Sequence, residues 1–363
     1  MKLSVTQENL SRALSTVSRV ASSRSSLPIL SNVLLRTEGN RLLVAATNLD
    51  IAVSETIGAK ITQAGAITVP ARLMQDFVGS LPAGTLELEV HENKLQLKAD
   101  RFDSTIHGVA ADDFPVMPVL EGGSAIEFTA GEMKQILHQV LFAASNDDAR
   151  PVLTGVYMHG TDSLLHIAAT DSYRLAEKRL KRSFGDISLL LPSQSLQELV
   201  RSLKEDSAPL QVSFDEQQAR FKVSDVEIVT RLLDGQYPDY QKLLPKKFET
   251  TAVVTRQALN EITKVSSLFA REAAGSITLL IDEAKQEISI SSIASQVGEN
   301  TANASATVQG DASITMNSRY ILDALAAFEG ESVQINVNGK LDPCILTDPA
   351  DESYIHVIMP VKS

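Results

Sequence analysis

The chain of 363 residues contains a single cysteine, Cys344, and no tryptophan. One cysteine excludes a disulfide framework and any zinc site built mainly from cysteine. Aromatic residues make up only 5% of the chain, which argues against a cofactor site built on stacked rings. Because Cys344 lies in a strand-like run, we expect it to be a small buried apolar residue and not a nucleophile.

Long apolar runs and an excess of positive charge are also missing. No stretch approaches the ~20 apolar residues that a membrane span needs, and residues 4–11 are polar where a signal peptide needs an apolar run. The chain has 33 basic and 45 acidic residues, a net charge of −12. That charge excludes a nucleic-acid-binding protein that is basic throughout, but it allows a separate basic face. We expect a cytoplasmic protein with no membrane partner.

Motifs that carry chemistry are scarce. The sequence has no glycine fingerprint for a nucleotide, no P-loop, no His-Glu-x-x-His and no Gly-x-Ser-x-Gly. The histidines show no ligand spacing, and we expect His159 and His166 on neighbouring strands. The acidic stretches 112–113 and 146–148 are more typical of solvent-facing loops than of a cation site. We therefore expect no catalytic residue, no metal and no cofactor.

What the sequence does contain is a module that occurs three times. Segments 5–21, 128–144 and 254–270 each begin with an apolar residue and a threonine and continue with apolar residues spaced three and four apart. That spacing places the apolar residues on one face of a helix, and each threonine is a good N-cap. In the third segment the predicted buried stripe is Leu259, Ile262, Val265 and Phe269.

A second helix is predicted in each module. Segments 70–81, 192–203 and 317–328 resemble one another and recur at intervals of 122 and 125 residues, in step with the first helices. Between the helices, apolar and polar residues alternate as in strands with one buried face, which suits antiparallel sheets. The fold class we predict is α+β, with three repeated domains that each pack two helices under antiparallel sheets. The predicted domains are 1–122, 123–246 and 247–363.

Charge is distributed unevenly between these elements. The six predicted helices together are slightly basic, so the strands and loops carry the whole acidic excess. If the exposed helix faces line one surface, that surface can attract phosphates while the remaining surface repels them. Solvated helix faces of mixed sign explain the same numbers nearly as well.

Six short segments carry a resemblance to a known family. They are residues 27–30 (LPIL), 69–72 (VPAR), 111–115 (ADDFP), 169–175 (ATDSYRL), 234–240 (DGQYPDY) and 357–361 (VIMPV). With these segments in this order, the chain resembles the bacterial sliding clamps, the beta subunits of DNA polymerase III, over its whole length. The resemblance implies a DNA clamp fold in which two chains join head to tail into a ring. Helices would line the hole and duplex DNA would pass through it.

The resemblance also implies a function and a set of partners. A sliding clamp is a non-catalytic processivity factor that tethers the replicative polymerase to its template. The implied partners are double-stranded DNA bound without regard to sequence, a second copy of the chain, the DNA polymerase III alpha subunit and the clamp-loader complex. Other polymerases, ligase and mismatch-repair proteins would bind through linear peptide motifs, in a groove between the second and third domains.

Site residues follow from the same resemblance. The implied DNA contacts are Arg24, Arg72 and Arg150, and the implied dimer interface is Ser104, Ile106, Leu268 and Phe269. The implied peptide groove consists of Leu153, Thr170, Ser172, Tyr173, Arg174, Leu175, Pro238, Lys242, Leu243, Asn317, Tyr320, Leu341, Pro343, Val357, Met359, Pro360 and Val361. Ser172, Tyr173, Lys242 and Ala274 depart from the residues common in the family, and these departures bear on peptide preference.

Two other functions stay open at this point. One is an enzyme whose site lies on the turn within residues 169–175, with Asp171 as a base and Arg174 as an anion clamp. The other is a peptide-binding scaffold without a role on DNA. No histidine or second carboxylate stands at a useful spacing from Asp171, which weighs against the enzyme.

Overall fold

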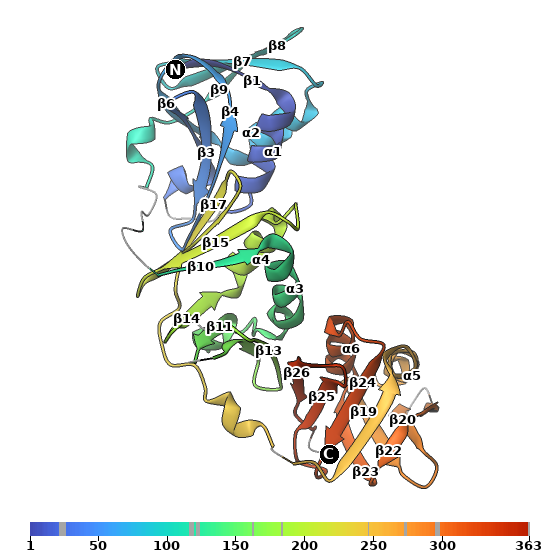
Figure 1. Cartoon of the computed structure of the whole chain (residues 1–363). Coiled ribbons are helices and arrows are strands. Elements are labelled where there is room, and N and C mark those ends of the chain that lie inside the picture. Colours follow the sequence, from blue (N-terminus) through green and yellow to red (C-terminus); the bar gives the residue numbers. More distant parts are fainter. Residues whose placement is uncertain are drawn as a thin grey trace. The chain divides into compact units, whose positions relative to one another are not determined.

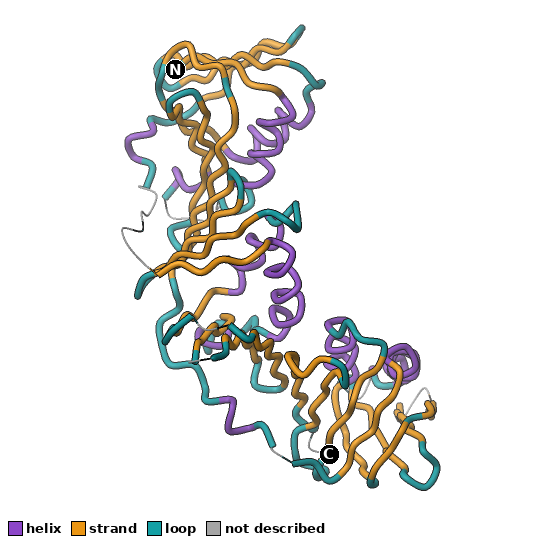
Figure 2. Tube along the Cα trace, viewed as in Figure 1, coloured by secondary structure: helices purple, strands orange, loops and turns teal. Residues whose placement is uncertain are grey.

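The computed structural model of the chain describes residues 1–21, 27–115, 120, 124–161, 163–182, 184–245, 247–271, 274–294 and 298–361. These residues form two compact units (Figures 1 and 2). The first consists of Met1–Lys134 with Gln194–Leu232, and the second of Gln135–Ser193 with Leu233–Ser363. Among the described residues, no helix combines the length and the apolar character that crossing a membrane requires.

The first unit is mainly antiparallel sheet with two helices packed on it. Its elements are β1 (Lys2–Thr6), α1 (Gln7–Val17), η1 (Pro28–Ser31), β2 (Asn32–Glu38), β3 (Arg41–Thr47), β4 (Ile51–Gly58), β5 (Lys60–Gln63), β6 (Ala66–Pro70), α2 (Ala71–Ser80), β7 (Thr85–His91), β8 (Lys94–Ala99), β9 (Phe102–His107), η2 (Ala111–Asp113), β10 (Ser124–Thr129), β15 (Pro209–Phe214), β16 (Gln218–Val223) and β17 (Val226–Arg231). Helices α3 (Ala130–Val140) and α4 (Ser193–Ser202) run across the division between the units.

The second unit repeats this construction. Its elements are η3 (Leu141–Ala143), η4 (Pro151–Thr154), β11 (Gly155–Gly160), β12 (Leu165–Thr170), β13 (Arg174–Leu180), β14 (Ser188–Pro192), η5 (Tyr240–Leu243), β18 (Thr250–Thr255), α5 (Arg256–Phe269), β19 (Ser276–Asp282), β20 (Glu287–Ala294), β21 (Gly298–Ser305), β22 (Thr307–Gln309), β23 (Ala312–Asn317), α6 (Ser318–Ala327), β24 (Ser332–Val337), β25 (Cys344–Asp348) and β26 (Asp351–Ile358).

Each unit is built around one large sheet that joins strands of two successive repeats. In the first unit the order is β10-β15-β16-β17-β4-β3-β2-β6, and in the second it is β14-β11-β12-β13-β26-β25-β24-β18-β22. The joining pairs are β17 with β4, where Thr230 is opposite Ile51, and β26 with β13, where Ile358 is opposite Arg174. The same strand of each repeat therefore pairs with the same strand of the repeat before it.

Two smaller sheets complete the units. The first unit contains β5-β1-β7-β8-β9, and the second contains β21-β20-β19-β23. In these sheets, β9 occupies the position that β17 and β26 hold in the large sheets, and β21 occupies the position of β4 and β13. As described, β9 and β21 are edge strands, so each has one side without a strand partner.

The predicted helices are present, and their threonine caps are confirmed. The hydroxyls of Thr6, Thr129 and Thr255 accept hydrogen bonds from the amide three residues on, at 3.1–3.3 Å. In Figure 1, α1 lies beside α2, and α5 lies beside α6. This pairing buries one face of each helix, as the spacing of the apolar residues predicts for α1.

The predicted stripe of α5 is wrong at Val265. The buried face of α5 contains Leu259, Thr263 and Ser266, whereas Val265 is exposed. Thr263 and Ser266 are small enough to let the helix lie close to the sheet, so the apolar Val265 and Leu268 face outward. The alternating strands agree with the prediction, as Leu86 and Leu88 of β7 are fully buried.

Candidate functional site

The turn between β12 and β13, residues 170–174, is held by its own side chains, and we call it the lip turn. The Thr170 hydroxyl donates to the carbonyl of Arg174 at 2.6 Å and accepts from the amide of Ser172 at 3.1 Å. The Asp171 carboxylate accepts from the amides of Tyr173 and Arg174 at 2.9 and 3.0 Å. Ser172 has a left-handed backbone with φ 76°, and Tyr173 is 63% exposed. Side chains that replace missing backbone bonds make such a turn rigid.

The first repeat builds the same turn between β3 and β4. The Thr47 hydroxyl donates to the carbonyl of Ile51 at 2.9 Å and accepts from the amide of Leu49 at 3.0 Å. The Asn48 side chain accepts from the amides of Asp50 and Ile51. Leu49 has φ 81°, matching Ser172. The two turns thus share a hydrogen-bond pattern although they share only their first residue.

The C-terminal segment lies against the lip turn. The amide of Met359 donates to the carbonyl of Tyr173 at 2.8 Å, and the amide of Val361 donates to the carbonyl of Thr315 in β23, also at 2.8 Å. Residues 359–361 therefore run from the lip turn to the smaller sheet of the same unit. This places Met359 beside Tyr173 and Val361 beside Thr315, and the role of residues 359–361 in a groove stays a prediction.

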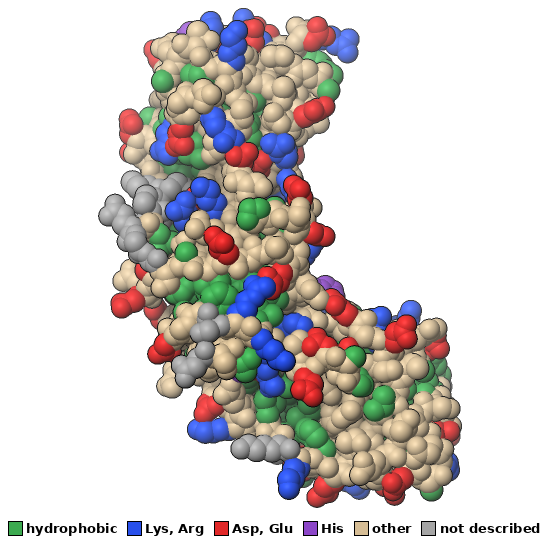
Figure 3. All heavy atoms as spheres, in the orientation of Figure 1, with side chains coloured by type: hydrophobic (Ala, Val, Ile, Leu, Met, Phe, Trp, Pro, Cys, Tyr) green, Lys and Arg blue, Asp and Glu red, His purple; other side chains and the backbone are tan. Residues whose placement is uncertain are grey.

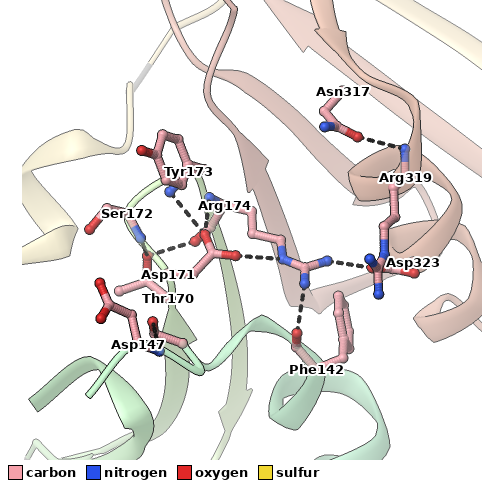
Figure 4. Close-up of polar contacts among 11 residues, drawn as sticks. Phe142, Asp147, Thr170, Asp171, Ser172, Tyr173, Arg174, Asn317, Arg319 and Asp323 are labelled. Atoms are coloured by element: carbon pink, nitrogen blue, oxygen red, sulfur yellow. Dashed lines mark hydrogen bonds and ion pairs between the residues drawn. The ribbon is translucent and has the colours of Figure 1, made fainter. Parts of the chain in front are cut away.

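Arg174 connects three elements of the second unit (Figure 4). Its Nε donates to Asp171 at 3.0 Å, one terminal nitrogen donates to Asp323 of α6 at 2.6 Å, and the other donates to the carbonyl of Phe142 at 2.9 Å. The guanidinium also lies 5.2 Å from the ring centre of Phe142 and 4.6 Å from that of Tyr320. Its side chain is only 10% exposed. All three nitrogens are thus engaged inside the protein.

This arrangement bears on the enzyme hypothesis. That hypothesis needs Asp171 as a base and Arg174 as an anion clamp. In the structure, the Asp171 carboxylate is bonded to two backbone amides and to the Arg174 guanidinium. Because the two groups are bonded to each other, neither is placed to act on a substrate, and the geometry favours a structural role for both.

An apolar cluster underlies the lip turn. It contains Leu153, Ala168, Leu175, Leu190, Tyr237, Tyr240, Ile345 and Val357, all buried. Three predicted groove residues, Leu153, Leu175 and Val357, are therefore residues of the core. Their place in one cluster brings together residues from η4, β13 and β26.

The other predicted groove residues surround this cluster at different depths. Thr170 is buried, and Asn317 caps α6 by accepting from the amide of Arg319 at 2.9 Å. Those that are partly buried are Arg174, Tyr320, Pro343, Met359 and Pro360. The exposed ones are Ser172, Tyr173, Pro238, Lys242, Leu243, Leu341 and Val361. Four large apolar side chains are therefore exposed within this set, namely Tyr173, Leu243, Leu341 and Val361.

A buried polar network holds η5, the helix that carries residues 242–243. The carboxylate of Glu177 accepts from Tyr240 of η5 at 2.7 Å, from Arg179 at 2.7 Å, and pairs with Nδ1 of His166 at 2.9 Å. Burial alone would raise the pKa of Glu177, but the His166 bond, the Arg179 charge and the Tyr240 bond outweigh it and lower the pKa to about 2. Glu177 therefore stays ionised and bonded at neutral pH.

Stacked rings extend this network. Tyr237 stacks on Tyr157 with ring centres 4.9 Å apart, Tyr157 stacks on His159 at 4.7 Å, and His159 stacks on His166 at 4.7 Å. The predicted proximity of His159 and His166 is confirmed, since they are opposite each other in β11 and β12. The scarcity of aromatic residues did not prevent a stack of four rings, which here fills a protein interior.

The predicted DNA contacts differ in how they are placed. Arg72 is the second residue of α2, and its side chain is 96% exposed. Arg150 is exposed, precedes η4, and donates to the hydroxyl of Ser172 in the lip turn at 3.0 Å. Arg24 lies outside the described residues. The role of all three on DNA stays a prediction.

The predicted interface residues lie on an edge strand and on a helix. Ser104 and Ile106 belong to β9, with Ile106 buried, and Leu268 and Phe269 end α5, with Leu268 exposed. Their contact with a second copy stays a prediction.

Two further kinds of group bear on chemistry, namely metal ligands and the thiol of Cys344. Within the described ranges, no group of three or more His, Cys, Asp or Glu side chains is arranged to hold a metal ion. Cys344 is fully buried, and this burial raises the pKa of its thiol to about 12. A thiol that is buried and protonated is a poor nucleophile, so the expectation for Cys344 is confirmed.

Sequence reasoning missed Asp323, Phe142 and Tyr240. Asp323 lies 149 residues from Arg174, and Tyr240 lies 63 residues from Glu177, so no local spacing connects them. The acid at the middle of α6 was nevertheless a signal, because the equivalent helices have an acid at the same position.

Comparison with known proteins identifies the family. Three family descriptions match in succession: the N-terminal domain of the DNA polymerase III beta subunit at residues 1–118, its central domain at 127–239 and its C-terminal domain at 241–362. The curated beta sliding clamp of Synechocystis is 30% identical, with 100% of this chain and 99% of that protein covered. That of Bacillus subtilis is 29% identical with both chains fully covered. The chain belongs to the DNA polymerase III beta subunit family, the bacterial sliding clamps.

Solved structures agree with this assignment. The sliding clamp of Bacillus subtilis has a TM-score of 0.96 and 28% identity, covering 100% of this chain and 99% of that one. The DNA polymerase III beta subunit of Pseudomonas aeruginosa has a TM-score of 0.94 and 26% identity with both chains fully covered. The predicted fold, a three-domain DNA clamp of helices and antiparallel sheets, is confirmed. As a sliding clamp, the chain is a processivity factor for DNA polymerase.

Proposed function

We propose that this clamp works without covalent chemistry, as a closed ring of two chains around duplex DNA, with its helices facing the hole. The observation that carries this proposal is the sheet pairing. Strands β17 and β26 each pair with the same strand of the preceding repeat, β4 and β13. Their counterparts β9 and β21 stand at the edges of their sheets, so a second copy can continue the pattern and satisfy both edges.

The repeat also predicts the register of this seam. Thr230 is opposite Ile51 in the first unit, and Ile358 is opposite Arg174 in the second. Transferring this register through the strand pairings of each repeat places Ser104 of one chain opposite Asn300 of the other. The same alignment places the end of α5, with Leu268 and Phe269, next to the neighbouring β9, which agrees with the interface that the resemblance implies.

Paired cysteines test the register. A chain with Ser104→Cys and Asn300→Cys should form two interchain disulfides under mild oxidation and run as a covalent dimer on denaturing gels. The control carries Ser104→Cys and Thr301→Cys, which points the second thiol to the other face of the sheet. Equal crosslinking of both pairs would contradict the proposed register.

Topological tethering has its own experiment. The clamp is loaded by a clamp-loader complex onto a nicked circular duplex and then separated from free protein by gel filtration. A ring should stay on the circle and slide off once a restriction enzyme opens it. Retention on the linear DNA would mean a tight grip on phosphates, and the proposal of a sliding ring would be abandoned.

For partner binding, we propose the surface formed by the lip turn, residues 242–243, residue 341 and residues 359–361. Its support is the set of exposed apolar side chains around a buried cluster, the pattern expected for short peptides with apolar anchors. The partners are the polymerase III alpha subunit and clamp loader, with other polymerases, ligase and mismatch-repair proteins using the same surface.

A peptide titration tests this surface. A labelled peptide from the tail of the polymerase alpha subunit is followed by fluorescence anisotropy. Leu243→Ala with Leu341→Ala should weaken binding by at least tenfold, because both exposed anchors lose contact area. The matched control is Leu280→Ala, an exposed leucine on β19. Unchanged affinity in the double variant would remove this site assignment.

We also propose the cytoplasm as the place of action and 1–122, 123–246 and 247–363 as the extents of the three domains. The support for both is membership of a family of replication proteins whose matched regions run in that order. Limited proteolysis would test the extents, since the first cuts should fall near residues 122 and 246.

A further inference from the structure

The second helix of each repeat has the same length and an acid at the same place. Helices α2, α4 and α6 each contain ten residues. Their sixth residues are Asp76, Glu198 and Asp323. The surrounding residues differ between the three helices, so the acid is a shared feature within otherwise divergent sequences.

Two of these acids pair with a base from the preceding repeat. Glu198 pairs with Arg19, which follows α1, at 2.9 Å. Asp323 pairs with Arg174 of β13 at 2.6 Å. Both pairs lie where a repeat meets the one before it, at β17–β4 in the first unit and at β26–β13 in the second. In these two helices the acid therefore forms an ion pair with the repeat that comes before it.

Asp76 has the same local setting but no such partner. Arg72 stands four residues before it at 3.9 Å, as Arg319 stands before Asp323 at 3.9 Å. The side chain of Asp76 is 71% exposed, whereas those of Glu198 and Asp323 are 12% and 33% exposed. The difference is that the first repeat has no predecessor in its own chain.

In the third repeat the position that matches Arg19 is Leu268, and the nearest base on α5 is Lys264, one helical turn before it. Arg19 folds back along α1, because its guanidinium donates to the carbonyl of Ser15 at 2.6 Å. Ser15 is the ninth residue of α1, and the ninth residue of α5 is Lys264. Both helices begin after a capping threonine, so the ninth positions correspond. Lys264 is exposed, and no ion pair to it occurs within the described part of the chain.

We infer that Asp76 of one chain pairs with Lys264 of a second copy across the seam. This inference rests on the proposed ring, and it adds an ion pair to the strand pairing and apolar contacts already proposed there. The occupant of the α2 surface around Asp76 is thus the α5 helix of the partner chain. Because a head-to-tail ring has two seams, each dimer would contain this pair twice.

Charge reversal tests the pair. The full chain with Asp76→Lys, and separately with Lys264→Asp, should have a dimer dissociation constant raised at least tenfold in sedimentation equilibrium, since each change puts like charges opposite each other. The chain carrying both changes should dimerise close to the wild-type level. An equal mixture of the two single variants should also recover dimers, because one seam regains the original pair and the other the reversed pair.

Each outcome has a distinct meaning. Recovery in the mixture and in the double variant supports the pair. Single variants that dimerise like the wild type would overturn it while leaving the ring intact, and a monomeric wild-type chain would overturn the ring itself. Arg271→Asp is the control for a neighbouring base after α5. If Arg271→Asp dissociates the dimer and Lys264→Asp does not, the assignment of Lys264 is wrong.

Discussion

At the scale of single residues, Arg174 determines how the lip turn meets α6. Its guanidinium is shared between Asp171 and Asp323, and it stacks between the rings of Phe142 and Tyr320. The resemblance places this arginine among peptide-binding residues. Because its donors are used internally, we propose that it supports the groove by positioning Tyr173 and α6 relative to each other.

Arg174→Lys should lower the free energy of unfolding by about 2–3 kcal/mol in urea titrations. A lysine cannot replace the planar fork that serves two carboxylates and a carbonyl, and it leaves partly buried acids without a partner. Arg319→Lys is the matched control, because Arg319 is exposed and should change stability by less than about 0.5 kcal/mol. Equal stability of Arg174→Lys and wild type would refute the structural role.

Ser172 has a left-handed backbone conformation that is unfavourable for serine and allowed for glycine. A non-glycine residue at φ 76° costs about 1–2 kcal/mol, although glycine also loses more entropy on folding. Ser172→Gly should therefore raise the free energy of unfolding by roughly 0.5–1 kcal/mol. The same change in an extended strand, Ser313→Gly in β23, should lower it by a similar amount. If both variants are destabilised alike, the lip turn is not strained as described.

At the scale of elements, β26 brings a buried histidine into the large sheet of the second unit. His356 is fully buried and stacks on Phe142, and no described residue hydrogen-bonds either ring nitrogen. Burial, assisted by the Arg174 charge, lowers the pKa of His356 to about 3. His159 in β11 also has a lowered pKa, because of its burial and the nearby His166.

Stability should therefore fall as the pH decreases below 6.5. In this range the two histidines bind protons in the unfolded chain but not in the folded chain. The free energy of unfolding therefore falls by up to about 1.4 kcal/mol per pH unit for each of them. Below pH 4.5 Glu177 adds to this fall, because the unfolded chain takes up a proton on Glu177 while the folded chain, in which its pKa is lowered to about 2, does not. Urea midpoints measured from pH 7.5 to 4 should follow this course, and a midpoint that stays constant over this range would contradict it.

His356→Leu isolates the contribution of one histidine. Leucine has nearly the same volume and no buried polar atoms, so the slope of stability between pH 6 and 5 should decrease by about 1 kcal/mol per pH unit. The exposed His138 provides the control, and His138→Gln should leave the slope unchanged. If the slope is the same in all three proteins, His356 is not a histidine whose pKa is lowered by folding.

At the scale of the whole molecule, the net charge and the local distribution of charge have different effects on DNA binding. The chain carries −12, and acidic and basic side chains are interspersed on the face drawn in Figure 3. Such a surface has little attraction for DNA in general. The proposed contacts of a few arginines on the helices and adjoining loops with DNA would be weak and independent of sequence, and weak contact is compatible with sliding.

Removing two of these arginines should change the salt dependence of DNA binding. Arg72→Ala with Arg150→Ala should reduce the slope of log affinity against log salt by about 0.9 for each lost phosphate contact. Anisotropy with a short labelled duplex between 25 and 150 mM salt provides the measurement. Arg36→Ala with Lys222→Ala, on a large sheet of the first unit, should leave the slope as it is. The DNA role of Arg72 and Arg150 fails if both pairs behave alike.

The helices, the strands and their threefold repetition could be predicted from local sequence patterns. Capping threonines, apolar residues spaced three and four apart, and strict alternation depend on neighbours within a few residues, so they are legible along the chain. The same local logic explains the burial of Cys344 and the place of His159 beside His166. The stripe of α5 failed at Val265 because the buried face there is made of small polar residues, which carry no hydrophobic signal.

Which residues far apart in the chain act together depends on how the elements pack. Arg174 contacts Asp323 because β26 pairs with β13, and Glu177 contacts Tyr240 because η5 docks on the sheet. Both contacts join residues that are far apart in the sequence. The family resemblance implies that Arg174 belongs to a binding surface, but its burial between two rings depends on where η3 and α6 lie. Hydrogen bonds and ion pairs act over a few ångströms, and distance in space between such residues is set by packing and not by position along the chain.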